Sequence, residues 1–236
     1  DNVNIRKALN LSLDRNVITD KVLGQGQTPT YVFTPTYIEE GQLIQQPAYS
    51  KEPMAQRNEE AIKLLEEAGY SKGNPLKFSI LYNTNENHKK VAIAAASMWK
   101  ANTKGLIDVK LENQEWKTYI DSRRAGRYDA ARAGWNADYN QATTFGNYFL
   151  SNSSNNTAKY ANPEYDKAIA ESYVATDAEG RAKAYAKAEE ILAKDFGIVP
   201  IFNYVNPRLV KPYVKGYSGK DPQDHIYLRN LYIIKH

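Results

Sequence analysis

The sequence predicts an α/β protein with a mostly parallel sheet. Strand-like and helix-like patterns alternate in the middle of the chain, with strands at 77–82, 107–111 and 128–132 separated by helices at 85–102 and 115–125. This alternation is typical of βαβ units, whose strands lie parallel. In open sheets of this type, ligands bind beyond the carboxyl ends of the strands. We therefore expect a site in the segment that follows the third strand.

Helical patterns and an extended connection precede this region. They comprise helices over 3–13, 14–23 and 58–68, and a connection rich in proline and aromatic residues over 25–53. Asp1 and Asn2 can cap the first helix, and Gly24 is a typical residue to end the second. Aromatic residues interleaved with prolines predict a packed, extended connection rather than a flexible linker.

Two helices and several short strands follow. The sequence predicts helices over 162–175 and 177–194, an apolar strand over 198–204, and strand-like runs over 208–210 and 231–234. Asn162 and Asp177 are suitable helix caps, and Pro200 favours an edge or an end of a sheet. The residues after 206 do not make a domain of their own. We expect their strands to join a sheet whose other members lie outside this chain.

The composition is that of an ordinary globular protein with a sizeable core, since 42% of its 236 residues are hydrophobic and 25% are charged. A net charge of +4 and the lack of a basic run argue against a nucleic-acid partner. The chain has no cysteine, which excludes disulfides and thiolate sites. No apolar run reaches the ~18 residues that a membrane helix needs. The chain opens without Met or a signal peptide, which suggests a processed chain or a fragment.

Residues 132–140 combine a cation, a large aromatic residue and an acid. Arg132 can bind a carboxylate through two parallel hydrogen bonds. Asp138 can bind an ammonium group, and Trp135 supplies flat apolar surface between the two charges. The segment can therefore hold a small zwitterion at the end of the third strand. In the alternative interpretation, Trp135 belongs to the core and the two charges pair with each other, and the spacing alone does not decide between them.

Catalysis has little support in the sequence. His88, His225 and His236 are scattered and form no paired metal-binding motif. Neither a nucleophile elbow nor a glycine-rich phosphate loop occurs. Glu115 and Asp138 could serve as the carboxylate pair of a glycosidase, but nothing in the sequence brings them together. We therefore expect neither an enzyme nor a bound metal or cofactor.

Motifs along the whole chain resemble those of a known family. In order, they are Leu81-Tyr82-Asn83-Thr84, His88-Lys89-Lys90, Trp99, Asn113-Gln114-Glu115-Trp116-Lys117-Thr118, the segment 131–140, Leu150-Ser151-Asn152-Ser153-Ser154, the segment 204–212, and Gly219-Lys220-Asp221-Pro222. This pattern is similar to that of the periplasmic oligopeptide-binding proteins, members of solute-binding protein family 5 and substrate-binding components of bacterial ABC peptide importers. The resemblance covers roughly the C-terminal half of such a protein, without its N-terminal part.

The resemblance implies a type II periplasmic clamshell that encloses a peptide between two lobes. Residues 1–205 would form the distal, ligand-binding lobe. Residues 206–236 would form the hinge and a C-terminal segment that returns to the proximal lobe. The implied partners are short peptides, the membrane permease of the ABC importer and the missing N-terminal portion of the same protein. The implied location is the periplasm.

The resemblance also gives the charged residues roles. Asp138 would bind the ammonium group of the peptide, whereas Arg132, Arg123 and His88 would bind the carboxylates of peptides of different length. Without the resemblance, Arg123 is more simply a solvated cation that complements the end of a helix. By the same reasoning, His88 is more simply a solvated residue at the start of the helix over 85–102.

Aromatic residues and main-chain groups complete the implied site. Trp116, Trp135 and Tyr204 would line side-chain pockets, although Trp116 taken alone is more often a core residue. Asn136 would tune one pocket. The main chain around Ala133, Gly134 and Ala137 would pair with the peptide as an added strand.

Two functions remain open at this point. The first is the capture of short peptides, with this chain as half of the site. The second is a related clamshell that binds another ligand, such as a murein peptide, haem or a nickel chelate. As an isolated fragment, the chain would bind nothing tightly, because half of the ligand's contacts would be absent.

Overall fold

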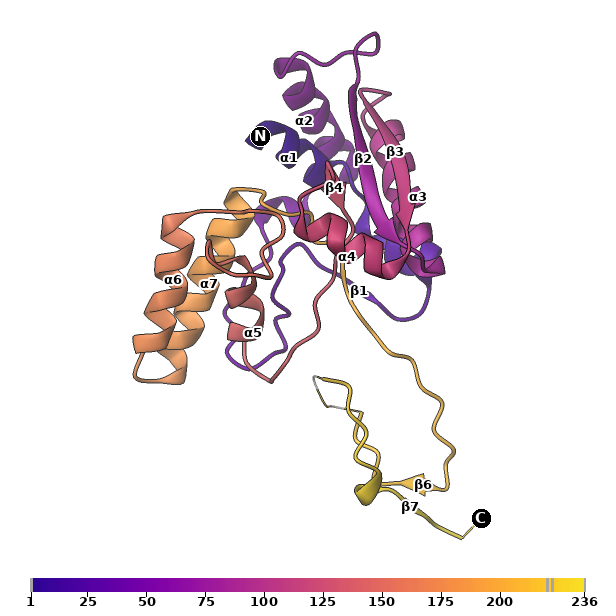
Figure 1. The fold of residues 1–236 in the computed structure, drawn as a ribbon, viewed down its shortest axis with the longest axis vertical. Helices are drawn as coiled ribbons and strands as arrows, with labels where there is room; N and C mark the ends of the chain where they lie inside the picture. The colour runs from indigo at the N-terminus through magenta and orange to yellow at the C-terminus, as the bar shows by residue number, and fades with distance from the viewer. Residues whose placement is uncertain (1, 220, 222, 236) are drawn as a thin grey trace.

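A computed structural model describes residues 2–219, 221 and 223–235. Its main body carries a sheet with flanking helices and a helical hairpin, and a thin arm leads away from the body to the carboxyl terminus (Figure 1). Strands and helices alternate in the body, so the predicted α/β class is confirmed. No helix of the described residues is long and apolar enough to cross a membrane.

A three-stranded parallel sheet forms the centre of the body. β2 (Leu76–Asn83) lies between β3 (Ile107–Gln114) and β4 (Ala130–Ala131) and is parallel to both. β3 continues beyond the predicted range because its register with β2 extends to the pair Asn83 and Gln114.

β4 is shorter than the predicted strand over 128–132 for a physical reason. The N–H of Ser79 on β2 donates to a carboxylate oxygen of Asp129 at 2.8 Å, so a side chain takes the place of a main-chain acceptor. The paired strand therefore begins only at Ala130. Beyond β4, the N–H of Arg132 still donates to the carbonyl of Leu81 at 2.8 Å, which holds the following segment against the sheet.

Capped helices connect the parallel strands. α3 (Glu86–Asn102) starts where the Asn85 side chain accepts a hydrogen bond from the N–H of His88. α4 (Trp116–Arg124) starts in the same way, with the Glu115 side chain accepting from the N–H of Lys117. The predicted inward face of α3 is confirmed, because Val91, Ala92, Ala95 and Trp99 are buried.

The amino-terminal elements pack beside this sheet. They are α1 (Val3–Leu11), the π-helix η1 (Val17–Leu23), β1 (Thr28–Pro29), the 3₁₀-helix η2 (Ala48–Lys51) and α2 (Met54–Glu67). The predicted cap Asn2 is confirmed, whereas Asp1 lies outside the described residues. The helical turn that leads into η1 begins at Arg15, because the Asp14 carboxylate accepts from the N–H groups of Asn16 and Val17 as a cap. α2 begins earlier than predicted, directly after Pro53.

A helical hairpin forms the other part of the body. α6 (Pro163–Val174) and α7 (Ala178–Lys194) pack against each other, and their predicted caps Asn162 and Asp177 are confirmed. Two short helices that the sequence pattern did not predict, α5 (Thr143–Gly146) and the 3₁₀-helix η3 (Asn147–Phe149), lie between the sheet and this hairpin in the chain.

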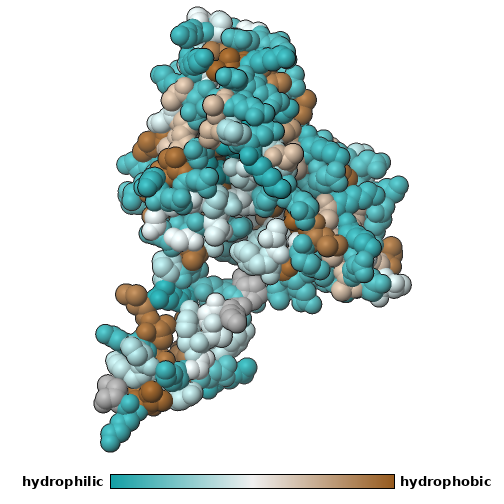
Figure 2. Space-filling view, turned by 180° about the vertical axis from the view of Figure 1, so that it is seen from behind, coloured by the Kyte–Doolittle hydropathy of each residue, from teal (hydrophilic) through white to brown (hydrophobic). Residues whose placement is uncertain are grey.

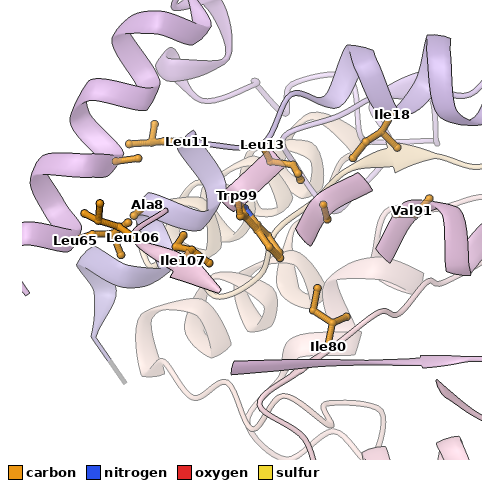
Figure 3. Packing of buried hydrophobic residues seen from close by; sticks show 12 residues of the cluster. Ala8, Leu11, Leu13, Ile18, Leu65, Ile80, Val91, Trp99, Leu106 and Ile107 are labelled. Carbon is orange, nitrogen blue, oxygen red and sulfur yellow. The ribbon is translucent and has the colours of Figure 1, made fainter. Parts of the chain in front are cut away.

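Two hydrophobic cores result from this arrangement. The first joins α1, α2, α3, β2 and β3, and Figure 3 shows Trp99 among the aliphatic side chains of this core. The second joins the α6–α7 hairpin to α5 and η3, with Phe145, Phe149 and Tyr165 among its buried residues.

The structure departs from the sequence prediction in the strand before residue 204 and in part of the arm after it. The strand expected over 198–204 is reduced to β5 (Phe202–Asn203), which pairs antiparallel with β1. Residues 208–210 form no strand, whereas β7 (Tyr232–Ile233) falls within the predicted run and pairs antiparallel with β6 (Val214–Lys215) after the short helix η4 (Leu228–Asn230). Apolar side chains gather on the arm (Figure 2), and Leu209, Leu228 and Ile233 are exposed.

A buried arginine joins segments that are distant in sequence. The Arg15 side chain is 0% exposed, and its Nε donates to the carbonyl oxygens of Thr30 at 3.1 Å and Pro200 at 2.7 Å. Its Nη1 donates to the carbonyls of Asn10 and Leu13, and its Nη2 donates to the Asn10 side chain. The guanidinium also lies 4.0 Å from the ring centroid of Tyr31. Arg15 thus fixes the connection after β1 and the segment before β5 to α1.

We predict that Arg15→Met lowers the free energy of unfolding by about 3 kcal/mol or more, because buried carbonyl oxygens lose their donors. Urea unfolding followed by circular dichroism measures this change. Arg57→Met is the matched control, since Arg57 is also buried beside Tyr31 but donates to its hydroxyl at 3.1 Å and to Met54 rather than to main-chain carbonyls. Equal losses for the two variants would contradict this role of Arg15.

Candidate functional site

A cleft of about 1080 Å³ lies along the edge strand β4 and the segment that follows it. Its walls come from the connection around 30–38, from 128–137 around and after β4, from 196–206 around β5, and from the arm. This volume is large enough for a ligand of several residues. The segment after the third parallel strand, over 132–137, lines this cleft.

The cleft brings together most of the predicted site residues. Those that line it are Arg123, Arg132, Ala133, Gly134, Trp135, Asn136, Ala137 and Tyr204. His88, Trp116 and Asp138 do not line it. Their positions differ, and each is described below.

Arg132 extends from the end of β4 and is half-buried. Its Nη2 donates a hydrogen bond to the Tyr204 hydroxyl, and its guanidinium lies 5.5 Å from the centroid of that ring. The carbonyl of Arg132 accepts a hydrogen bond from the hydroxyl of Tyr119. Within the described residues, Arg132 forms no ion pair with Asp138, so the surface pairing considered for these two charges does not occur.

Trp135 and Asp138 are both tied to Thr144 of α5. The indole N–H of Trp135 donates to the Thr144 carbonyl at 2.9 Å, and its ring packs on Tyr148 with centroids 5.0 Å apart. Trp135 thus lies on the second core while lining the cleft. Asp138 is exposed, its N–H donates to the Thr144 hydroxyl at 3.0 Å, and that hydroxyl lies 3.3 Å from the carboxylate. No cation of the described chain forms an ion pair with Asp138, so its carboxylate is available to an ammonium group.

Arg123 lies half-buried at the end of α4 rather than in solvent. Its Nη2 donates to the hydroxyls of Tyr148 at 3.0 Å and Thr157 at 2.9 Å, and its guanidinium lies 5.5 Å from the centroid of Tyr119. Its buried Nε has no hydrogen-bond partner in the described structure. A guanidinium surrounded by hydroxyls retains the capacity to bind an anion.

His88 lies in the first turn of α3, and its ring Nδ1 is 2.8 Å from the side-chain oxygen of Asn83. Burial, and then the positive charge of Arg132, lower the pKa of His88 to about 4. The imidazole is therefore neutral at pH 7. With Nδ1–H donating to Asn83, Nε2 carries a proton only when the ring is charged.

Trp116 is 56% exposed at the start of α4, so it is not a core residue. Its ring stacks on that of Tyr119, with centroids 5.7 Å apart. Tyr119 is buried and holds the carbonyl of Arg132, so Trp116 covers the residue that supports the end of β4.

The structure adds an aromatic wall that the motifs did not indicate. Phe33 from the long connection meets Phe145, Tyr148 and Phe149 with ring centroids 4.8 to 5.5 Å apart, and all four line the cleft. The buried carboxylate of Glu189 holds this connection by accepting the N–H groups of Phe33 and Thr34. In the sequence, this wall was indicated only by the prolines and aromatic residues that alternate in the connection over 25–53.

The arm supplies part of the opposite wall. Tyr217, Gly219, Asp221, Gln223 and Asp224 line the cleft, whereas Lys220 and Pro222 of the same motif lie outside the described residues. Residues of this chain's own arm therefore form part of the cleft wall. The described residues contain no group of three or more His, Asp or Glu side chains that could hold a metal ion.

Comparison with known proteins identifies relatives of the whole chain. The family model described as bacterial extracellular solute-binding proteins, family 5 Middle, matches residues 1–157. The periplasmic oligopeptide-binding protein OppA of Haemophilus influenzae is 97% identical over 236 residues, which are 100% of this chain and 44% of that protein. The chain therefore spans less than half the length of this relative.

Two solved structures share the fold over the full chain. The crystal structure of Haemophilus influenzae OppA in complex with the peptide RPPGFSPFR matches with a TM-score of 0.92 and 96% identity, over 100% of this chain and 46% of that one. The Escherichia coli murein tripeptide-binding protein MppA matches with a TM-score of 0.88 and 43% identity, again over 100% and 46%. The family resemblance inferred from the motifs is confirmed.

The low pKa of His88 leads to a measurable titration. We predict that its ring signal titrates near pH 4 by NMR, and that Arg132→Gln moves this pKa upward but not to the ordinary value, because burial is the larger cause. His88→Asn identifies the signal. Because the folded pKa lies below the unfolded one, His88 also lowers stability as the pH falls from about 6.5 toward 4, and His88→Asn should remove that loss. A titration of His88 near pH 6.5 would contradict the half-buried, cation-adjacent position.

Proposed function

Because the chain belongs to family 5 of the bacterial extracellular solute-binding proteins, we propose that it binds short peptides in the periplasm for delivery to an ABC importer. The observation that carries the proposal is the main chain of residues 133–137. Within the described residues, its N–H and C=O groups form no main-chain hydrogen bonds, and this segment lines the cleft. Unpaired main-chain groups beside a cleft can add a peptide strand without reading its side chains.

Opposite charges flank this segment and supply end recognition. Asp138 binds the peptide ammonium group, and Arg132 and Arg123 bind carboxylates of peptides of different length. Both arginines line the cleft and have hydroxyl partners rather than acidic ones among the described residues, which supports this assignment. His88 can bind a carboxylate only after its ring takes up a proton, because the neutral ring presents an unprotonated Nε2.

Aromatic surfaces allow the cleft to accept different side chains of the peptide. Trp135 and Tyr204 line pockets from two sides of the cleft, and Asn136 tunes one of them. Trp116 contributes from its exposed position on Tyr119. Wide, partly aromatic pockets accept many side chains, because water fills the space that a small side chain leaves.

The chain acts as part of a longer protein in this proposal. Residues 1–205 form the distal lobe, and 206–236 form a hinge and a segment that returns to the proximal lobe, whose remainder comes from the missing N-terminal portion. The exposure of Leu209 at 105%, Leu228 at 76% and Ile233 at 70% supports this division, because such apolar surface requires a cover. The remaining partner is the membrane permease of the importer, and no catalytic step is proposed.

A related ligand is the second candidate. The similarity to a murein tripeptide-binding protein favours a cell-wall peptide over haem or a nickel chelate. The described residues contain no cluster of ligands for a metal ion, and a peptide of either kind uses the same main-chain pairing.

We predict that Asp138→Asn in the longer protein weakens the binding of peptides with a free amine by about 2–5 kcal/mol, because a buried ammonium group loses its charged partner. Isothermal titration calorimetry measures this loss. N-acetylated peptides should show little difference between the variant and the wild type. Asp121→Asn, on the exposed face of α4, is the matched control. Unchanged affinity of Asp138→Asn for free-amine peptides would refute the ammonium role.

A further inference from the structure

Tyr204 occupies the positions at which the proposed ligand would bind. It follows β5 directly, at the point where the chain leaves the body for the arm. Its hydroxyl accepts a hydrogen bond from Arg132, and the guanidinium lies 5.5 Å from its ring centroid. This phenol is a neutral acceptor on a cation that has no acidic partner within the described residues.

The same ring lies against the main chain of Gly134. A Cβ atom at position 134 would lie 2.7 Å from Cζ and 2.8 Å from Cε2 of Tyr204, closer than real Cβ contacts. The absence of a side chain at Gly134 therefore permits the approach of Tyr204. As a result, one side chain covers both the charged group of Arg132 and part of the main-chain strand over 133–137.

A carboxylate is a stronger partner for a guanidinium than a phenol is. A carboxylate carries the opposite charge and can accept two parallel hydrogen bonds from one arginine, whereas the phenol is uncharged and accepts one. An amide or ester end is neutral and gains no such advantage over the phenol. Displacement of Tyr204 is therefore favourable for a ligand that ends in a carboxylate at Arg132 and unfavourable for one that does not.

We propose that Tyr204 is an internal competitor for Arg132, which lowers the affinity of the cleft for peptides whose free carboxylate reaches Arg132 more than for the same peptides with a neutral end. This inference rests on the proposed peptide-binding function. The inferred role differs from that of a residue that only lines a pocket. Loss of the Tyr204 hydroxyl is expected to strengthen peptide binding rather than weaken it.

The test compares Tyr204→Phe with the wild type in the longer protein. Calorimetry with alanine peptides of two to five residues, each as the free acid and as the C-terminal amide, measures the affinities. Arg132→Gln identifies the length whose acid form depends on Arg132. For that length, Tyr204→Phe should bind the acid roughly three- to tenfold more tightly, because one hydrogen bond no longer has to be broken. It should change the affinity for the amide less, because an amide leaves Tyr204 on Arg132 in the wild type.

A second measurement requires no ligand. Phenylglyoxal modifies exposed guanidinium groups, and mass spectrometry of the digested protein reports the rate at Arg132. Tyr204→Phe should raise this rate several-fold, whereas Tyr148→Phe, which removes the hydroxyl that Arg123 contacts, should leave the rate at Arg132 unchanged.

The outcomes separate the inference from the proposed function. Peptide binding by the wild type with weaker or unchanged binding of the acid by Tyr204→Phe overturns the inference alone. An equal phenylglyoxal rate at Arg132 in wild type and Tyr204→Phe also overturns it. Absence of peptide binding by every variant overturns the proposed function, and with it the competition that Tyr204 is inferred to exert.

Discussion

The guanidinium of Arg15 lies where three segments of the chain meet, and the arrangement of the cleft depends on it. Its hydrogen bonds reach the carbonyls of Thr30 and Pro200, which lead into the two segments that carry Phe33 and Tyr204. A guanidinium has five donors in a fixed plane, so it sets the relative position of several carbonyls at once. The first hydrophobic core, which includes α1, is thereby joined to both sides of the cleft.

The cleft itself combines unpaired main chain over 133–137 with Arg123 and Arg132, which have hydroxyl partners but no acidic partner among the described residues. In a compact body, such groups would be costly unless water or a ligand satisfied them. The structure keeps them at the rim of the second core, where Thr144 holds Trp135 and Asp138, and Tyr119 holds the end of β4. The rigid support and the unsatisfied groups together are the basis for the proposed binding of a zwitterionic chain.

Much of the sheet was predictable from the sequence, because β2, β3 and α3 have clear periodicities and capping residues. The short β4 was not, since the carboxylate of Asp129 replaces a main-chain acceptor through a contact between residues far apart in the chain. The buried position of Arg15 was also hidden, because a charged residue near a helix start is normally expected at the surface. In the candidate site, residue chemistry singled out Arg132 and Asp138 as candidates. The contact of Tyr204 with Arg132 and Gly134 depends on segments that only the fold brings together.

The central claim is that this chain contributes to a cleft for short peptides, and the ligand that the longer protein retains tests it most directly. Native mass spectrometry of that protein, purified without denaturation, measures the mass of any bound molecule. We predict a mixture of short peptides with free amino and carboxyl ends, which is lost in Asp138→Asn. Retention of haem, a nickel chelate or another non-peptide molecule at this cleft would contradict the account.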